Sequence, residues 1–259
     1  MAKKFKDYYD DETVRFIADK ISYVFIGFDS NSFSSYVAKN IVNKEFLERQ
    51  DVFSNAFEKF LGDNYVKNIS LFTKILGPEL KTETGMFSQG YWLWPIGRYV
   101  ERHGTKNFTV SSNFIHSLTK RFTGEYAIRP LLVKFPKETM KIMLAWSKDE
   151  NVHVRRLASE GLRINLPWSK KNTVCLDEFT TYKKILSNLK GDTSKFVQKS
   201  VGNNLNDLYK SYPEKAIEII NVWQQENPGK ETLWIINHGM RSIKKKIKKE
   251  KNFLDQSIQ

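Results

Sequence analysis

Three acidic residues interrupt otherwise basic segments of the sequence and could carry chemistry: Glu125 in TGEYAIRP, Glu160 in RRLASEGLR and Asp207 in VGNNLNDLYK. On a surface that binds phosphates, a carboxylate is unfavourable unless it meets a positive group. An N-alkylated adenine or cytosine is such a group. A carboxylate can also stabilise the cationic sugar that forms as a glycosidic bond breaks, or deprotonate the attacking water. The alternative is that each carboxylate balances a neighbouring arginine.

One tryptophan near these carboxylates in the sequence could stack on a base. Trp168 lies in NLPWSKK, in the turn expected after the helix that carries Glu160, and Pro167 restricts the chain just before it. Aromatic rings hold damaged bases by stacking, and a cationic base adds cation–π attraction. A core position is expected for Trp92, Trp94, Trp146 and Trp234, and either position for Trp223.

Basic residues gather on the same segments as the carboxylates. The sequence holds 42 Lys and Arg against 29 Asp and Glu, a formal net charge of +13. We expect a curved basic surface that follows the phosphates of duplex DNA with little sequence preference. Its expected residues are Arg129, Arg155, Arg156, Arg163, Lys195, Lys199, Arg241, Lys244, Lys245, Lys246, Lys248 and Lys249. The alternatives are solvated helix faces and, for Arg155 or Arg156, ion pairs with Asp149 or Asp192 that brace neighbouring repeats.

Motifs for other catalytic chemistries are missing from the sequence. HExxH and His/Cys metal spacings do not occur around His103, His116, His153 or His238, and GxSxG, P-loop and GxGxxG patterns are absent. Cys175 is the single cysteine, which excludes an internal disulfide and a multi-cysteine metal cluster. We therefore expect neither a metal nor a nucleotide cofactor.

The elements that must position these residues are predicted to be helices. Apolar residues recur at steps of three and four, and alternating runs bounded by hairpin turns are missing. In residues 11–26, one helical face holds Val14, Ile17, Ala18, Ile21 and Phe25. The predicted fold class is all-α.

An internal repeat orders these helices. Residues 146–162 align with residues 189–205 at an offset of 43. The alignment pairs Asp149 with Asp192 at the turn between helices, and Val154 with Val197, Ala158 with Val201 and Leu162 with Leu205 at buried positions. A helix–turn–helix unit with a period in the forties is typical of HEAT repeats. Further units are interpreted over residues 213–241, with a turn at 227–229, and over 111–135, with helices at 111–122 and 124–135.

Together the units predict one HEAT-like repeat domain over residues 1–259, a solenoid whose second helices line a concave basic groove. Residues 1–84 lack repeat spacing and are predicted to form an N-terminal helical cap, and residues 250–259 a frayed tail. The N-terminus lacks the apolar run of a signal peptide, and no stretch approaches the roughly 18 apolar residues of a membrane span. We expect a monomeric cytoplasmic protein that does not bind membranes.

At these residues the sequence resembles the AlkC/AlkD superfamily of DNA alkylation-repair glycosylases, and it is more similar to the AlkC branch. The resembling stretches lie within residues 90–242 and are GYWLWPIGRYVERHG, EYAIRPLL, WSKDENVHVRRLASEGLRINLPW, FVQKSVGNNLNDLYKSYPE and WIINHGMRS. The resemblance implies an all-helical HEAT-like fold. It also implies hydrolytic excision, without metal or cofactor, of positively charged bases such as 3-methyladenine or 3-methylcytosine.

The resemblance also implies roles for particular residues. By motif position, Glu125, Glu160 and Asp207 match the family's acidic residues around the lesion, and Trp168 matches the adjoining aromatic residue. The chain departs from the family at residues 163–165, which are Arg-Ile-Asn where Arg-Pro-Arg is expected, at one phosphate or lesion contact. The prediction is a monofunctional alkylbase DNA N-glycosylase acting on duplex DNA. The alternative is a non-catalytic HEAT-repeat module that binds nucleic acid or serves as a scaffold.

Overall fold

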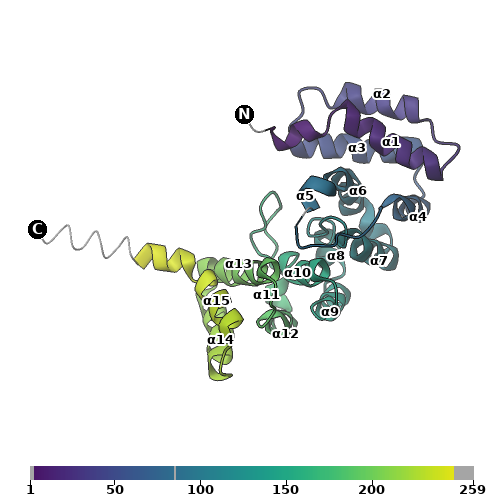
Figure 1. The fold of residues 1–259 in the computed structure, drawn as a ribbon. Helices are drawn as coiled ribbons and strands as arrows, with labels where there is room; N and C mark the ends of the chain where they lie inside the picture. Colours follow the sequence, from purple (N-terminus) through teal and green to yellow (C-terminus); the bar gives the residue numbers. More distant parts are fainter. Residues whose placement is uncertain (1–2, 85, 248–259) are drawn as a thin grey trace, which may run out of the picture. The chain divides into compact units, whose positions relative to one another are not determined.

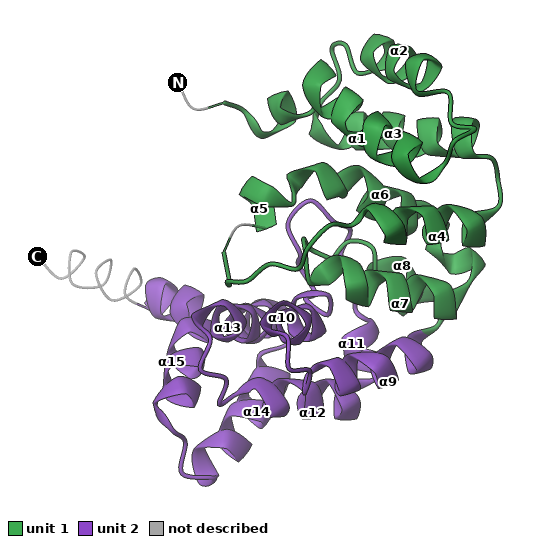
Figure 2. Ribbon diagram, turned by 45° about the vertical axis from the view of Figure 1, so that its right-hand side comes forward, with its two compact units in different colours: residues 1–135 green, residues 136–259 purple. Residues whose placement is uncertain are grey.

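The computed structural model describes residues 3–84 and 86–247, and every regular element within them is helical (Figure 1). The all-α prediction is confirmed. The chain divides into two compact units, residues 1–135 and residues 136–259 (Figure 2). The single repeat domain over residues 1–259 stays a prediction, and the expected tail at 250–259 lies outside the described residues.

Unit 1, residues 1–135, is built from short helices around an aromatic core. Phe57 stacks on Phe33 with ring centroids 5.7 Å apart, and it meets Phe72 edge-on at 5.0 Å. These contacts join three helices into one core. The helices of this unit are α1 (Asp11–Val24), α2 (Ser30–Asn40), α3 (Phe46–Leu61), α4 (Tyr65–Ile75), α5 (Met86–Gln89), α6 (Trp94–His103), α7 (Phe108–Thr119) and α8 (Arg129–Lys134), with 3-10 turns η1 (Phe5–Tyr8), η2 (Tyr91–Leu93) and η3 (Gly104–Lys106).

Local chemistry sets the ends of these helices. Asp10 caps α1, because its side chain accepts a hydrogen bond from the Thr13 N–H. The predicted apolar face of α1 is buried, whereas Phe25 lies past the helix end and is half-buried. The helix predicted over residues 124–135 begins only at Arg129, and residues 125–128 form a turn. Pro130 lies in the first turn of α8, where its missing N–H costs no hydrogen bond.

Unit 2, residues 136–259, contains the predicted repeat. Helices α9 and α10 form one hairpin and α12 and α13 the next, and α9 packs against α12 while α10 packs against α13. Two further helices, α14 and α15, both pack against α13. The helices are α9 (Pro136–Trp146), α10 (Val152–Glu160), α11 (Val174–Asp177), α12 (Phe179–Leu189), α13 (Lys195–Ser211), α14 (Pro213–Gln225) and α15 (Lys230–Gly239), followed by helical residues 241–247.

The two turns of the repeat use the same hydrogen bonds. Asp149 Oδ1 accepts from the Asn151 N–H at 2.8 Å, and Asp192 Oδ1 accepts from the Ser194 N–H at 2.9 Å. Asn151 and Ser194 in turn cap α10 and α13. All six apolar positions paired by the offset of 43 are buried. The HEAT-like repeat is therefore confirmed in this part of the chain.

Helices α13 and α15 cross closely because glycine stands at the crossing. A Cβ added to Gly239 would lie 2.7 Å from Leu205 Cβ, and one added to Gly202 would lie 2.7 Å from His238 Cδ2.

The structure shows which tryptophans belong to the core. Trp223 on α14 is a core residue, because it is buried and donates to Ser187 Oγ at 2.9 Å. The core positions predicted for Trp92 and Trp94 are confirmed. The prediction is wrong for Trp146 and Trp234, which are half-buried.

Candidate active site

Two of the three predicted carboxylates are joined by one guanidinium group in unit 2. Glu160 ends α10, and Asp207 lies 44 residues after Arg163, within α13. Arg163 donates from Nη1 to Glu160 Oε1 at 3.0 Å and from Nε to Asp207 Oδ2 at 3.1 Å. The side chains of Glu160, Asp207 and Arg163 are only 7, 5 and 11% exposed. The packing of α10 against α13 thus creates a buried acidic pair with a cation between its members.

The loop that follows α10 is attached to Asp207. The Asn165 N–H donates to Asp207 Oδ2 at 3.2 Å, and Arg163 Nη2 donates to the Asn165 carbonyl oxygen at 3.3 Å. Further along, the Asn172 N–H donates to the Ile164 carbonyl oxygen at 3.2 Å. The Ile164 side chain is fully buried. The loop is therefore fixed at its start to the same carboxylate that Arg163 contacts.

Trp168 is the exposed aromatic residue of this loop. Its side chain is 61% exposed, and its φ of 60° lies in the left-handed region that bulky residues rarely adopt. Such backbone strain persists only where the surroundings impose it, and it is frequent at functional sites. The loop thus carries an accessible indole three residues after the N–H that binds Asp207.

Glu160 is ionised in spite of its burial. Burial by itself raises the pKa of this carboxyl, but the charges of Arg156 and Arg163 and hydrogen bonds from Ser200 and Arg163 lower it by more, so the net pKa lies below its usual value. Arg156 Nη2 lies 3.5 Å from Glu160 Oε1. A carboxyl with a lowered pKa is a poor general acid at neutral pH. The group is better suited to stabilising a cation.

The arginine that joins the carboxylates is also held in its charged form. Burial lowers the pKa of Arg163, but the negative charges of Glu160 and Asp207 and the hydrogen bonds to both raise it to a net value above the usual one. Two carboxylates and the two guanidinium groups of Arg156 and Arg163 cancel in formal charge. Attraction for a further cation therefore depends on contact with a carboxylate oxygen and not on net charge.

The third predicted carboxylate lies in unit 1. Glu125 is in the turn before α8 and is 3% exposed. Arg129, predicted to contact DNA, opens α8 and is 5% exposed. Burial raises the pKa of the nearby Glu101, and the charges of Arg98 and Arg129 partly offset this. The roles of Glu125 at a lesion and of Arg129 at a phosphate remain predictions.

Two predicted DNA contacts participate in the packing of unit 2. Arg155 donates from Nε to Asp192 Oδ2 at 2.7 Å and from Nη1 to the Asp149 carbonyl oxygen at 2.9 Å. The alternative interpretation of Arg155 as a brace between repeats is thus confirmed. The guanidinium of Arg156 lies 4.8 Å from the ring centroid of Phe196 on α13. Both arginines join α10 to the repeat that follows it.

The remaining predicted DNA contacts lie on α13 and after α15. Arg241 donates to Asn203 Oδ1 at 2.8 Å and to the His238 carbonyl oxygen at 2.7 Å, and it is half-buried. Lys199 and Lys245 are exposed, and neither forms an ion pair with another residue that the structure describes. Lys195, Lys244 and Lys246 are exposed as well, whereas Lys248 and Lys249 lie outside the described residues.

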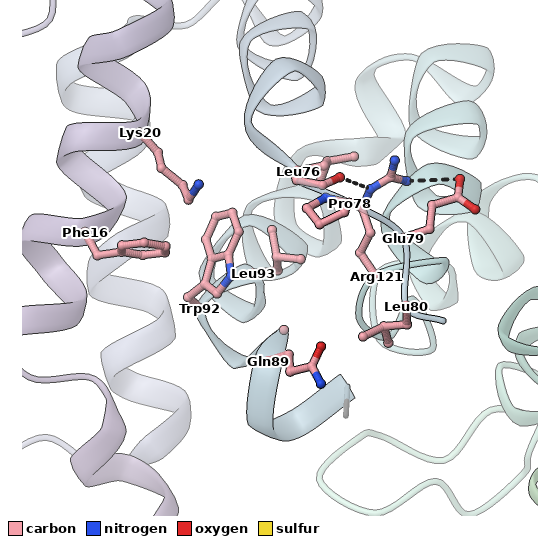
Figure 3. A pocket seen from close by; sticks show the side chains of 12 residues that line it. Phe16, Lys20, Leu76, Pro78, Glu79, Leu80, Gln89, Trp92, Leu93 and Arg121 are labelled. Carbon is pink, nitrogen blue, oxygen red and sulfur yellow. Dashed lines mark hydrogen bonds and ion pairs between the residues drawn. The ribbon is translucent and has the colours of Figure 1, made fainter. Parts of the chain in front are cut away.

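Sequence reasoning missed two features. The first is the buried pair Ser159 on α10 and Ser200 on α13, whose Oγ atoms lie 2.6 Å apart; a serine inside a helix carries no distinguishing sequence signal. The second is a pocket of about 250 Å³ within unit 1 (Figure 3). There Phe16 and Trp92 meet edge-to-face at 5.3 Å, and the ammonium of Lys20 lies 5.2 Å from the Trp92 centroid. The predicted site residues do not line this pocket.

Over residues 3–84 and 86–247, no group of three or more His, Cys, Asp or Glu side chains is placed to hold a metal ion. In the same part of the chain, none of the helices has the length and apolar character to cross a membrane.

Known proteins match this chain over the segment that contains the carboxylates. The family model for DNA alkylation repair enzymes matches residues 122–243. The Pseudomonas fluorescens alkylpurine DNA glycosylase AlkC, solved with DNA containing an abasic site analog, superposes with a TM-score of 0.81 and 30% sequence identity, over 94% of this chain. The chain belongs to the AlkC/AlkD superfamily. Within the superfamily it is closer to AlkC, as the sequence resemblance implied.

A relative from Bacillus subtilis aligns with most of this chain. The uncharacterized protein YhaZ of Bacillus subtilis (strain 168) is 31% identical over 249 residues, which is 95% of this chain. This chain spans 66% of the length of that protein and 65% of the AlkC chain. The family segment includes Glu125, Glu160, Trp168 and Asp207.

Proposed function

We propose that this protein is a monofunctional DNA glycosylase of alkylation repair, which hydrolyses the glycosidic bond of positively charged N-alkylated bases in duplex DNA. The observation that carries the proposal is the buried pair Glu160 and Asp207, joined by Arg163, in a chain of the AlkC/AlkD superfamily. The AlkC structure contains DNA with an abasic site analog, which supports DNA as the partner.

The proposed reaction needs a stabilised cation and a water molecule. As the bond between C1′ and the base nitrogen breaks, its electron pair goes to the base, which leaves neutral, and the sugar becomes an oxocarbenium ion. Water then adds to C1′ and releases a proton, which gives an abasic site. The ionised carboxylate of Glu160 stabilises the sugar cation in this scheme.

Asp207 is the proposed partner of the water. Its Oδ2 accepts from Arg163 Nε and from the Asn165 N–H, whereas its Oδ1 receives only a long contact of 3.5 Å from Arg163 Nη2. Oδ1 therefore keeps acceptor capacity for a water proton. The hydrogen-bond and ion-pair partners of these two carboxylates in the described structure are Arg156, Arg163 and the Asn165 N–H, with no lysine among them, which favours hydrolysis over a Schiff base.

The surrounding residues have proposed roles in binding. The exposed indole of Trp168 stacks against the alkylated base, and Glu125 helps to surround it. Lys199, Arg241 and Lys245 contact phosphates, with Arg129, Arg155, Arg156 and Arg163 as supporting cations. We further propose that the protein acts as a monomer in the cytoplasm.

The decisive experiment measures base release. Purified protein is incubated with methylated duplex DNA, and freed bases are identified by mass spectrometry, which also ranks 3-methyladenine against 3-methylcytosine. Glu160→Gln and Asp207→Asn are each expected to slow release by roughly 100-fold or more. The matched control is Glu218→Gln, because Glu218 forms an exposed ion pair with Lys183 on other helices of unit 2. The proposal fails if the wild type binds methylated DNA but releases no base, or if both site variants keep full activity.

A non-catalytic DNA-binding module is the second candidate. One observation favours it: Arg156 and Arg163 lie within 3.5 Å of Glu160, and Arg163 also pairs with Asp207, so these two carboxylates balance neighbouring arginines. This candidate predicts equal binding to methylated and undamaged duplexes with no base release. The assay of base release separates the two candidates directly.

A further inference from the structure

Basic and aromatic side chains form a strip where α13 and α15 pack together (Figure 2). On α13 the members of the strip recur every fourth residue, and along α15 and the residues after it they recur at steps of four and three, so each set shares one helical face. Its two lysines are exposed and its other side chains are half-buried, so the strip lies at the surface. The six residues of this α13–α15 strip are Lys195, Lys199, Asn203, Trp234, His238 and Arg241.

The lysine at one end of the α13–α15 strip is held in place. Lys195 Nζ donates to Gln198 Oε1 at 2.7 Å and lies 4.1 Å from the ring centroid of Trp234. Gln198 is itself fixed, because its Nε2 donates to the Asp192 carbonyl oxygen at 2.7 Å. The contact with the indole stabilises the ammonium by cation–π attraction. One positive charge of the strip therefore has a defined position.

The histidine in the middle of the strip is held from two helices. His238 stacks on Trp234 of its own helix, with ring centroids 4.9 Å apart and an angle of 10° between the ring planes. A Cβ added to Gly202 would lie 2.7 Å from His238 Cδ2, so the imidazole rests against the backbone of α13. His238 Nε2 lies 3.3 Å from Asn203 Oδ1. These contacts give the imidazole one orientation.

The neighbouring arginine assigns the proton of the neutral imidazole. Arg241 Nη2 donates to Asn203 Oδ1 at 2.8 Å, and because a guanidinium can only donate, the acceptor must be the amide oxygen. That oxygen can only accept from His238 as well, so Nε2 carries the proton and Nδ1 holds a lone pair. Within the part of the chain that the structure describes, Nδ1 forms no hydrogen bond.

The charges of the strip have no acidic partner in the described residues. Lys195, Lys199 and Arg241 form no ion pair there, and Glu231 at the start of α15 lies 3.9 Å from Lys230 instead. Burial and the positive charges of Arg241 and Lys199 lower the pKa of His238. The imidazole is therefore neutral at neutral pH until a negative group approaches.

We propose that the α13–α15 strip binds a phosphate of the DNA backbone, and that His238 takes up a proton as the phosphate binds. The phosphate supplies the negative charge that the strip lacks, and the protonated imidazole donates to it from Nδ1. The stacked ring of Trp234 stabilises the imidazolium by cation–π attraction. The inference rests on the proposed function for the identity of the partner, which is DNA.

The test measures binding of an undamaged DNA duplex across pH. A rhodamine-labelled duplex is titrated by fluorescence anisotropy at constant ionic strength, from about pH 7.5 to about pH 5.5. Binding favours the protonated imidazole, whose population grows as the pH falls, so the affinity should rise. We expect Kd to fall roughly tenfold, about the effect of one added hydrogen bond to a charged group. His238→Gln keeps a donor for Asn203 but gains no charge, so its Kd should change much less.

The matched control is His116→Gln. His116 is a half-buried histidine on α7 in unit 1, outside the strip. This variant should gain affinity as strongly as the wild type when the pH falls. At about pH 5.5, the plot of log Kd against log salt concentration should be steeper by about 0.9 in the wild type than in His238→Gln, the contribution of one phosphate contact. Equal pH dependence in the wild type and His238→Gln overturns the proposal.

Calorimetry separates this inference from the proposed function. Titration of the duplex in buffers of different ionisation enthalpy counts the protons that the complex takes up, and it needs no base release. At about pH 6.5 the wild type should take up more protons than His238→Gln. If the wild type shows this uptake but releases no base from methylated DNA, the proposed function fails and the inference stands. If base release is normal and the two proteins take up equal numbers of protons, or if the wild type does not bind the duplex at any pH, the inference fails.

Discussion

Replacement of Arg163 by methionine tests the electrostatic reasoning most directly. The variant keeps an unbranched apolar chain of similar reach but leaves Glu160 and Asp207 without the cation between them. Both carboxylates are more than nine-tenths buried, so water does not easily replace the lost charge. We expect a large loss of stability that depends on pH.

The magnitude follows from the groups that remain. Removal of one member of a buried ion pair typically costs about 3–5 kcal/mol. Glu160 keeps Arg156 at 3.5 Å, and Asp207 keeps the Asn165 N–H. These contacts place the expected loss near the lower end, at about 3 kcal/mol at neutral pH.

The sign of the pH dependence follows from the pKa of Glu160. In the wild type this pKa is lowered, so the carboxylate contributes stability above its ordinary pKa of 4.5, and that contribution disappears as the pH falls through the folded-state value. Without Arg163, fewer positive charges oppose the effect of burial, so the pKa of Glu160 rises. Protonation of Glu160 then removes a buried negative charge that destabilises the variant. The difference in the free energy of unfolding between wild type and variant should therefore be largest at about pH 7.5 and much smaller near pH 4.

The assay is urea unfolding followed by far-UV circular dichroism at both pH values. Lys183→Met is the control, because Lys183 pairs with Glu218 on the surface and should cost about 1 kcal/mol or less. The variant Arg163→Met combined with Glu160→Gln and Asp207→Asn removes all three charges and should recover much of the loss. A loss below about 1 kcal/mol, or one equal at both pH values, would refute the reasoning.

Two further predictions concern the backbone. Trp168→Gly is expected to raise the midpoint of thermal unfolding by relieving the left-handed φ, a gain of about 1 kcal/mol at most, while base release falls. Trp168→Ala keeps the strain and should lose activity without that gain, and equal unfolding midpoints in the two variants would contradict the prediction. Gly239→Ala is expected to lower stability in urea by about 1–3 kcal/mol, because its Cβ would lie 2.7 Å from Leu205 Cβ. An unchanged urea midpoint would show that α13 and α15 can separate at no cost.

The repeat of unit 2 was predictable because its signals are local. Asp149 and Asp192 each accept from a backbone N–H two residues ahead, and a helix start follows in both cases. Both the turn hydrogen bonds and the spacing of apolar residues depend on residues within a short stretch of sequence. The second helix of the unit before it was predicted too long, because helical periodicity continues through residues 124–128 although the backbone there forms a turn.

The candidate site was only partly predictable. Sequence identified Glu160 and Asp207 as acidic residues within basic segments, and Trp168 as the aromatic residue of the following turn, since residue type and local pattern suffice for that. Arg163 was predicted as a DNA contact, and only the structure revealed that it donates to both carboxylates.

By itself, the sequence determined the helical class, the period of the repeat and the identity of the acidic residues. Tertiary structure decided which of them meet, whether they are buried and which neighbours control their ionisation. The physical reason is that helix formation depends on residues a few positions apart, whereas Arg163 and Asp207 are 44 positions apart. Their ion pair exists only because α10 and α13 pack side by side and exclude water from the charges between them.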